Sequence, residues 1–312
     1  MTFTIKQNII KKAYELGFDD IGFTIPELSD INRQHLVRYK EKGYGDEMPW
    51  LVDDIDKRSN PKKIWENVKS VICLAVNIKP NSEQEICSQN SDFAQIAFHA
   101  QGKDYHKVIK KRLIKLGHFI KEETGADFKA FVDTAPVMEK PLAEQAGIGW
   151  QGRHSLIVSK KLGTLHMLGE LFVDIAITPD SPSENHCGTC KRCVDACPTA
   201  AISIDSGIDV LKCIAFHTIE NKGDIPDEVS KDMGSRIYGC DACAKVCPFN
   251  KFNQKPGTML EPRLFNLRLD DLAQIDESEF NKLFQGTGVK RIGFLRFKRN
   301  LQTARKNNQK SK

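Results

Sequence analysis

The pattern of apolar and polar positions predicts alternating helices and strands over the first 177 residues. Ile5, Ile9, Ala13 and Leu16 recur every three to four positions, which is typical of an amphipathic helix, and Gly17 ends it. A run rich in β-branched residues, VKSVICLAVNI, indicates a buried strand. The same criteria predict helices at 5–16, 105–120 and 139–146 and strands at 20–24, 68–78, 128–133, 156–159 and 168–177.

This alternation favours an α/β or α+β fold. We expect an α+β protein whose N-terminal domain, residues 1–177, is of α/β type. The polar stretch DSPSEN marks a loop-like boundary, after which a cysteine-rich module occupies residues 178–253. Residues 254–312 should form a short helical segment with a basic tail, because apolar residues recur at helical spacing between positions 269 and 284.

Composition narrows the class of protein. The chain has 312 residues, 40% of them hydrophobic, which is enough for more than one domain with a substantial core. We find no apolar stretch of transmembrane length and no signal peptide at the N-terminus. We therefore expect a monomeric, cytoplasmic protein with no membrane partner.

The charge is unevenly distributed. The formal net charge of +5 does not by itself indicate a nucleic-acid-binding protein, but residues 290–312 contain nine basic residues and no acidic one. Such a tail is equally compatible with a solvated, frayed end and with phosphate contacts. The basic residues are Lys290, Arg291, Arg296, Lys298, Arg299, Arg305, Lys306, Lys310 and Lys312.

Eight of the ten cysteines form the most specific pattern in the chain. The first run is Cys187-x-x-Cys190-x-x-Cys193-x-x-x-Cys197, followed by proline. This is the bacterial ferredoxin spacing for 4Fe–4S clusters, in which the fourth cysteine binds the other cluster. A structural zinc site needs only four ligands, and a disulfide framework is typical of short secreted chains. The pattern therefore predicts a ferredoxin-like module with two 4Fe–4S clusters.

The second run, Cys240-x-x-Cys243-x-x-x-Cys247, lacks its first cysteine, because position 237 is Ile237. Cys213 is the candidate replacement. The residues between Cys213 and Cys240 then form an insertion that is anchored at both ends by cluster ligands. We assign Cys187, Cys190, Cys193 and Cys247 to cluster 1, and Cys197, Cys213, Cys240 and Cys243 to cluster 2.

A glycine-rich segment, GIGWQG at 147–152, matches the dinucleotide-binding fingerprint literally. That fingerprint requires a strand before it and a helix after it, whereas here a helix precedes and a strand follows. The context therefore argues against a Rossmann site. The chain also lacks the phosphate-binding loop of the nucleotide hydrolases.

Two acid–base candidates lie outside the clusters. Asp133 follows a predicted strand and could donate a proton, although a helix-capping carboxylate would be the commoner role. Tyr105 and His106 open the long helix, and a surface position is as consistent with the pattern as a catalytic one. The D-x-H-x-x-G signature of a cobalt-binding histidine begins here but fails, because its glycine position is Ile109.

Taken together, these segments resemble the epoxyqueuosine reductase family over about residues 1–255. The resemblance rests on the displaced Cys213 and on the segments GKDYHK (102–107), FVDTAP (131–136), GIGWQGR (147–153), LGE (168–170) and YGCDAC (238–243). It implies an oxidoreductase with two 4Fe–4S clusters and cobalamin, without a protein histidine on cobalt. Such an enzyme reduces epoxyqueuosine to queuosine at the wobble position of tRNA.

The resemblance also implies roles for individual residues. It places Asp133 at the proton donor, with Tyr105 and His106 nearby. It implies cobalamin contacts by Arg58, Asp133, Arg153, His154, Lys222, Gly239, Cys240 and Asp241. The expected partners are tRNA and an external low-potential electron donor. Longer members continue into a helical-repeat region, so the basic tail could supply part of the tRNA contact here.

Two other functions compete with this one. A reductive dehalogenase-like cobalamin enzyme would act on a small molecule, but such enzymes usually carry an export signal. A non-catalytic ferredoxin-type electron carrier would not need an N-terminal domain of this size.

Overall fold

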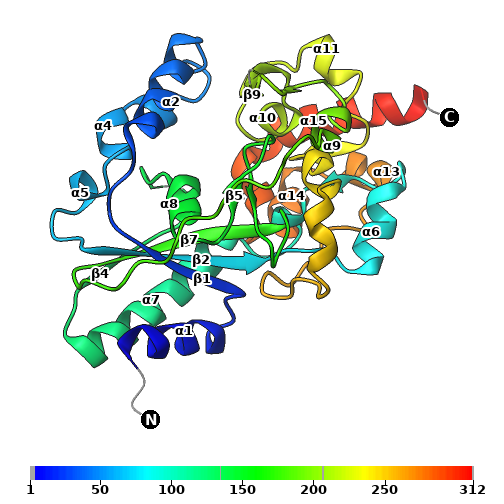
Figure 1. Cartoon of the computed structure of the whole chain (residues 1–312). Helices are drawn as coiled ribbons and strands as arrows, with labels where there is room; N and C mark the ends of the chain where they lie inside the picture. The colour runs from blue at the N-terminus through cyan, green and yellow to red at the C-terminus, as the bar shows by residue number, and fades with distance from the viewer. Residues whose placement is uncertain (1–3, 134, 206, 311–312) are drawn as a thin grey trace. The chain divides into compact units, whose positions relative to one another are not determined.

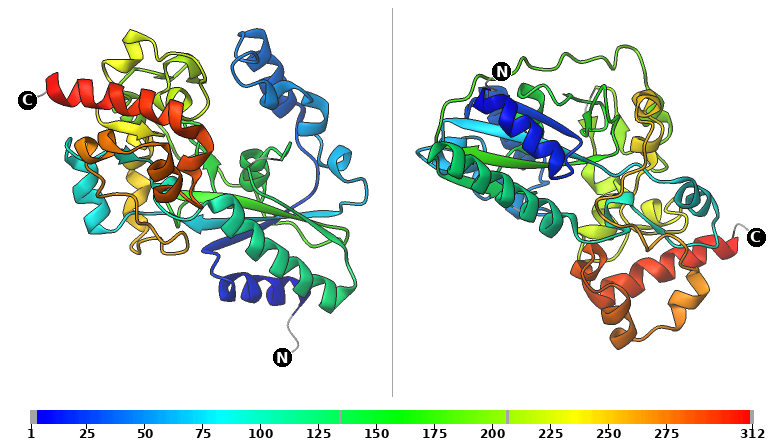
Figure 2. Two further views of the ribbon diagram at one scale, coloured as in Figure 1. Left: turned by 180° about the vertical axis from the view of Figure 1, so that it is seen from behind. Right: turned by 90° about the horizontal axis from the view of Figure 1, so that it is seen from below.

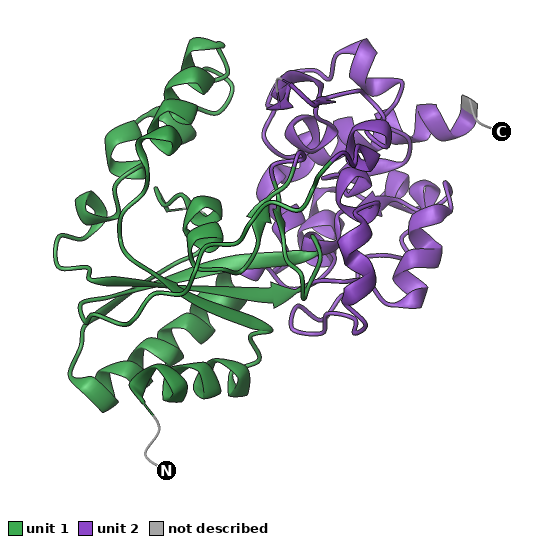
Figure 3. Ribbon diagram, in the orientation of Figure 1, with its two compact units in different colours: residues 1–77, 106–152, 156–188 green, residues 78–105, 153–155, 189–312 purple. Residues whose placement is uncertain are grey.

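A computed structural model describes residues 4–133, 135–205 and 207–310 (Figure 1). The chain divides into two compact units (Figure 3). Unit 1 comprises residues 1–77, 106–152 and 156–188, and unit 2 comprises residues 78–105, 153–155 and 189–312. Among the described helices, none is long and apolar enough to cross a membrane.

Unit 1 is built on a four-stranded sheet in the order β1 (Asp20–Thr24), β2 (Ser70–Asn77), β7 (His166–Val173) and β4 (Phe128–Phe131). Every pairing in this sheet is antiparallel. The expectation of an α/β-type N-terminal domain is therefore wrong, because such domains have mainly parallel sheets. Helices and antiparallel strands together make unit 1 an α+β structure.

Helices cover both faces of this sheet (Figure 1, Figure 2). Helices α1 (Ile5–Glu15) and α7 (Tyr105–Thr124) lie on one face, and α8 (Glu139–Gln145) lies on the other. Two glycines allow the helices to pack close to the sheet. A Cβ on Gly169 would collide with Ile109 of α7, and a Cβ on Gly22 would collide with Ala146 at the end of α8. Successive residues of a strand therefore face different helices.

Most predicted elements of unit 1 are confirmed within a few residues. The predicted strand at 168–177 instead ends at Val173, and the one at 156–159 is only the two-residue β6 (Ile157–Val158), paired with β5 (Trp150–Gln151). The sequence pattern missed four helices before β2, which are short or weakly amphipathic. They are α2 (Asp30–Glu41), α3 (Pro49–Val52), α4 (Ile55–Arg58) and α5 (Pro61–Ile64).

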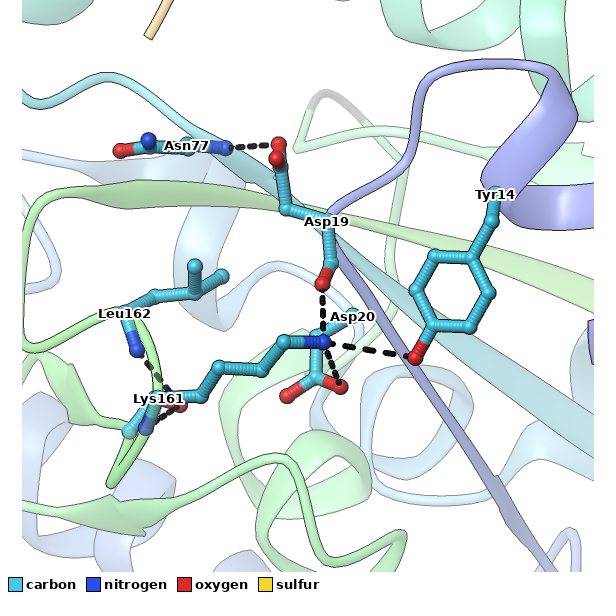
Figure 4. A network of polar contacts seen from close by, with 7 residues as sticks. Tyr14, Asp19, Asp20, Asn77, Lys161 and Leu162 are labelled. Atoms are coloured by element: carbon cyan, nitrogen blue, oxygen red, sulfur yellow. Dashed lines mark hydrogen bonds and ion pairs between the residues drawn. The ribbon is translucent and has the colours of Figure 1, made fainter. Parts of the chain in front are cut away.

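A lysine network secures the start of the sheet (Figure 4). Lys161 Nζ donates to the Asp19 carbonyl at 2.5 Å and lies 3.3 Å from both the Asp20 carboxyl and the Tyr14 hydroxyl. Burial raises the pKa of Asp20, and the neighbouring ammonium opposes this rise. The Asp19 carboxylate accepts from the Asn77 amide at 2.7 Å. The network therefore joins α1, β1 and β2 to the loop before β7.

Unit 2 has its own apolar core, in which four phenylalanines of the C-terminal helices pack on one another: Phe280, Phe284, Phe294 and Phe297. Strands β3 (Gln95–Ile96) and β10 (Arg236–Tyr238) pair in parallel, and β8 (Ile202–Ser203) pairs with β9 (Gly207–Ile208). The other elements are α6 (Ser82–Gln89), η1 (Phe98–Ala100), α9 (Arg192–Asp195), η2 (Val210–Lys212), α10 (Ile214–Ile219), α11 (Asp227–Ser230), α12 (Ala242–Lys245), η3 (Pro248–Phe252), α13 (Leu269–Gln274), α14 (Glu277–Leu283), η4 (Gly288–Ile292) and α15 (Gly293–Lys310).

The basic tail forms helix α15 and is anchored to the insertion between Cys213 and Cys240. Arg299 donates to the carbonyls of His217 and Asn221 at 2.6 and 3.0 Å. Asn300, fully buried, donates to the carbonyls of Thr218 and Ile237, each at 2.9 Å. A frayed end is therefore the wrong description of this segment as far as residue 310.

We predict that Gly22→Ala destabilises unit 1. The new Cβ would lie 2.0 Å from the carbonyl oxygen of Ala146, so strand β1 and the end of α8 would have to separate. Overpacking of this kind typically costs about 1–3 kcal/mol. The thermal unfolding midpoint should fall, while Gly223→Ala, whose Cβ meets only a flexible side-chain oxygen at 3.5 Å, should leave it nearly unchanged.

We predict that Asn300→Ala loosens the insertion. It leaves two backbone carbonyls without their donor, a loss of about 1–3 kcal/mol for each buried group. Limited proteolysis should cut residues 214–239 faster than in the parent. The exposed Gln302→Ala on the same helix is the control. Equal proteolysis rates in the two variants would show that Asn300 does not hold this segment.

Candidate functional site

The Asp133 carboxyl lies at the end of β4 and is available to a substrate. Its side chain is 48% exposed, and Oδ2 lies 3.0 Å from Nε2 of His106, which comes from the first turn of α7. Asp133 adopts a positive φ of 49°, which is uncommon for a residue with a side chain. The neighbouring Thr134, part of the FVDTAP segment, lies outside the described residues.

Glu139, at the start of α8, holds the backbone of Asp133. The Asp133 amide donates a short hydrogen bond to Oε1 of Glu139. Burial is the main cause that raises the pKa of Glu139 to about 7, and the Asp133 charge adds to it. Glu139 carries no signal in the sequence, because a glutamate in the first turn of a helix is a common residue that the helix dipole favours.

Glu170 is a second acid that the sequence analysis did not assign to the chemistry, although it belongs to the LGE segment. It is 0% exposed on β7 and lies on the face that packs against α8, between the apolar side chains of Leu168 and Phe172. Burial and the nearby Glu139 charge raise its pKa well above the ordinary value. The sequence signal that could have identified Glu170 is a glutamate at an inward-facing position of an otherwise apolar strand.

Arg58 is brought to the same site from α4. Its side chain is buried, donates to the Trp50 carbonyl at 2.9 Å and stacks on the Trp50 ring. Burial lowers its pKa, while the charges of Asp133 and Glu139 raise it. Unit 1 thus gathers Arg58, His106 and Asp133, which the sequence analysis named, with the two glutamates that it did not.

Tyr105 does not share this environment. Although it precedes His106, it belongs to unit 2, where its ring meets His99 edge-on with centroids 5.8 Å apart. Successive residues of a helix point about 100° apart, so the two side chains diverge. A joint role of Tyr105 and His106 stays a prediction.

The remaining residues assigned to cobalamin lie in unit 2. Arg153 Nε donates to the Cys190 carbonyl at 3.1 Å, and His154 is buried. Lys222 is exposed in the insertion that α15 anchors. The Asp241 carboxylate accepts from the Phe98 amide at 2.9 Å, and burial raises its pKa to about 6.

A cavity of about 250 Å³ lies within unit 2 and is lined by Gly239, Cys240 and Asp241. Gly239 has a φ of +70°, and a Cβ there would lie 2.6 Å from that of Ala97, so only glycine fits. The cavity is smaller than the ~300–1,000 Å³ of drug-sized ligand pockets, so by itself it does not hold a corrin.

The four thiols assigned to cluster 2 lie in unit 2 and influence one another's ionisation, and their assignment to one cluster stays a prediction. Burial raises the pKa of Cys213, Cys240 and Cys243, and the interactions among these thiols and Cys197 raise it further. Cys197 Sγ also accepts from the Ala201 amide at 3.2 Å. Crowded, half-buried thiolates repel one another, and bound iron relieves that repulsion, so the donor set suits an iron–sulfur cluster.

The cluster 1 assignment stays a prediction, because Cys187 belongs to unit 1 and Cys190, Cys193 and Cys247 belong to unit 2. Within unit 1, Trp150 Nε1 donates to Cys187 Sγ at 3.3 Å, the kind of contact that tunes a cluster ligand. Among the described residues, no three potential ligands are arranged around a single metal ion.

Two family models match the chain. Residues 58–134 match "Epoxyqueuosine reductase QueG, DUF1730", and residues 186–250 match "4Fe-4S double cluster binding domain". The second match includes the seven cysteines of the two runs and Cys213 between them, since Cys187 to Cys247 fall inside it. It therefore supports the ferredoxin-like module predicted from their spacing.

Relatives match over nearly the whole chain. The epoxyqueuosine reductase of Vibrio cholerae is 40% identical over 301 residues, which cover 94% of this chain and 81% of the relative. A crystal structure of epoxyqueuosine reductase with a tRNA-Tyr epoxyqueuosine-modified stem loop matches with a TM-score of 0.87 and 30% identity, covering 98% of this chain and 82% of that one.

A Bacillus subtilis epoxyqueuosine reductase, solved with its catalytic aspartate loop swung out of the active site, matches with a TM-score of 0.85 and 30% identity. This match covers 98% of this chain and 82% of the relative. Identity of 40% with a relative of which the chain covers 81%, together with these folds, shows that the chain belongs to the epoxyqueuosine reductase family of oxidoreductases.

Proposed function

We propose that this chain reduces the epoxide of epoxyqueuosine in tRNA to the alkene of queuosine, with Asp133 as the proton donor. The observation that carries the proposal is the exposed Asp133 carboxyl, 3.0 Å from His106 and held through its backbone by Glu139. The stem-loop complex of one relative and the catalytic aspartate loop of another support it. The dehalogenase-like and carrier alternatives are not favoured by the family relationship.

The reaction consumes two electrons and two protons and releases the epoxide oxygen as water. Cobalamin, when held by the residues named for it, would supply low-potential cobalt as the source of these electrons, and the two 4Fe–4S clusters would supply cobalamin in turn. The protein must protonate the departing oxygen, because an alkoxide is a poor leaving group. Asp133 can do this from its exposed position, and His106 can hold or return the proton through Nε2.

The division of labour along the chain is part of this proposal. Residues 1–177 form the cobalamin-binding catalytic domain, 178–253 carry the clusters, and 254–312 stabilise the insertion. We propose the cobalamin contacts as named above: Arg58 and Asp133 in unit 1, and Arg153, His154, Lys222, Gly239, Cys240 and Asp241 in unit 2. The protein acts as a cytoplasmic monomer that receives electrons from an external low-potential donor.

Nucleoside analysis of tRNA from a deletion strain tests the function. Epoxyqueuosine should accumulate and queuosine should disappear, and a plasmid copy of the gene should reverse both changes. Normal queuosine in the deletion strain would refute the assignment.

We predict that Asp133→Asn lowers turnover by about 10²–10⁴-fold, the usual contribution of a general acid. Cluster absorption and cobalamin binding should remain, because Asn keeps the shape and the backbone amide. Asp127→Asn, an exposed carboxylate just before the same strand, is the matched control. Parent-like product formation by the Asp133→Asn enzyme would remove Asp133 from the chemistry.

We predict that Cys213→Ala removes one cluster and roughly halves the bound iron, since each cube needs its four thiolates. Cys87→Ala, which alters a cysteine outside both runs, should retain the full iron content after anaerobic reconstitution. If Cys213→Ala kept all of its iron and its electron paramagnetic resonance signals, the displaced-ligand assignment would be wrong.

A further inference from the structure

Glu170 is an acid placed where the fold would favour an apolar residue. It is 0% exposed in a layer formed by Leu168, Phe172, Cys73 and Leu142, and neither of its carboxyl oxygens accepts a hydrogen bond from a donor among the described residues. The carboxyl that interacts with it is that of Glu139. An ionised carboxylate in such surroundings is very unfavourable, so Glu170 holds its proton. Stability alone would be better served by leucine, so this position needs another explanation.

The proton of Glu170 is directed at Glu139. A hydrogen bond between two carboxyl groups requires at least one proton, carried by the group that acts as the donor. Glu170, the more deeply buried, is the donor, and Glu139 is the acceptor, since this contact favours the ionised form of Glu139. Glu139 thereby keeps a second lone pair for the Asp133 amide.

The Asp133 backbone needs such support. Its φ of 49° lies in the left-handed region, where a residue with a side chain persists only when its surroundings hold it. The Glu139 hydrogen bond is made to this residue's own amide, while its carboxyl remains beside His106. In the Bacillus subtilis relative, the corresponding catalytic loop has been observed out of the active site.

We propose that Glu170 and Glu139 form a proton-sharing pair that positions Asp133: Glu170 donates to Glu139, and ionised Glu139 holds the Asp133 amide, keeping its carboxyl on His106. Both glutamates are positioning residues, because they act on the reaction through Asp133. The inference rests on the proposed function of Asp133 but concerns how its loop is held.

The charged groups around Glu139 set the direction of its pH response. The charge of Asp133 raises the pKa of Glu139, whereas Lys140, Arg58 and the interaction with Glu170 favour its ionised form. Cys73 on β2 adds no charge, because burial raises the pKa of its thiol. With a pKa of about 7, Glu139 becomes ionised as the pH rises through neutrality. An ionised acceptor binds an N–H more strongly, so the hold on Asp133 tightens above that pH.

Hydrogen exchange of the Asp133 amide, measured by mass spectrometry of the reconstituted holoenzyme and corrected for the intrinsic rate, tests this directly. Protection should rise about tenfold as the pH increases from about 6 to about 8, and turnover should change with the same midpoint. Glu139→Gln keeps an acceptor oxygen but cannot ionise, so the pH dependence of protection should vanish. The exposed Glu123→Gln is the control and should behave as the parent.

Two substitutions at Glu170 separate positioning from simple stability. Glu170→Leu suits the apolar layer but removes the donor, so the midpoint should move up by about one pH unit. Glu170→Gln restores a donor and should return the midpoint to the parent value. A parent-like pH dependence in Glu139→Gln, or an unshifted midpoint in Glu170→Leu, overturns the proposal.

The outcome is distinguishable from a failure of the proposed function. If Asp133→Asn turned over normally, Asp133 would not be the proton donor, yet the exchange data on Glu139→Gln would still decide whether the pair holds its amide. Conversely, a strong turnover loss in Asp133→Asn with unchanged exchange in the glutamate variants would retain the proton donor and reject the pair.

Discussion

Like charges that must be kept close together are the constraint around which unit 2 is organised. Cys197, Cys213 and Cys240 each oppose the ionisation of another thiol of the set, which also contains Cys243, and burial adds to this effect. Ionising these neighbouring thiols is unfavourable without iron. The backbone must therefore keep the four cysteines close together until iron binds. This accounts for the many hydrogen bonds that anchor the insertion, which lies between the proposed ligands Cys213 and Cys240.

Helix α15 supplies much of that anchoring. Arg299 and Asn300 use their donors on carbonyls of the insertion, and Thr218 in turn accepts from the Gly239 amide at 2.9 Å, next to Cys240. Helix α15, although distant in sequence, thereby restricts the backbone next to Cys240, a proposed cluster ligand. The 26 residues between Cys213 and Cys240 form a long connection. Held only by contacts within that connection, the two cysteines could move apart and lose the geometry that a shared cluster needs.

Unit 1 handles its like charges differently, by sharing a proton rather than by binding metal. Asp133, Glu139 and Glu170 lie together, and the fold protonates the most buried of them while Arg58 opposes the remaining negative charge. The sequence revealed the cysteines because ligand spacing is local. It did not reveal the carboxyl group cluster, because β4, α8 and β7 meet only in the folded sheet, and no local pattern records which strands are neighbours.

The same limit explains the errors in the fold. Helical periodicity located α1, α7 and α8, since each buries one face, but it could not show that every strand of the sheet pairs antiparallel. The same periodicity also could not distinguish basic side chains that remain in solvent from those that hydrogen-bond to the rest of the fold. Arg296 and Arg299 donate to backbone carbonyls, so they are committed to the fold, whereas Lys290 and Lys306 remain exposed. Arg291 is exposed as well, so among the described basic residues of this segment only some are accessible to a phosphate, fewer than the sequence count suggests.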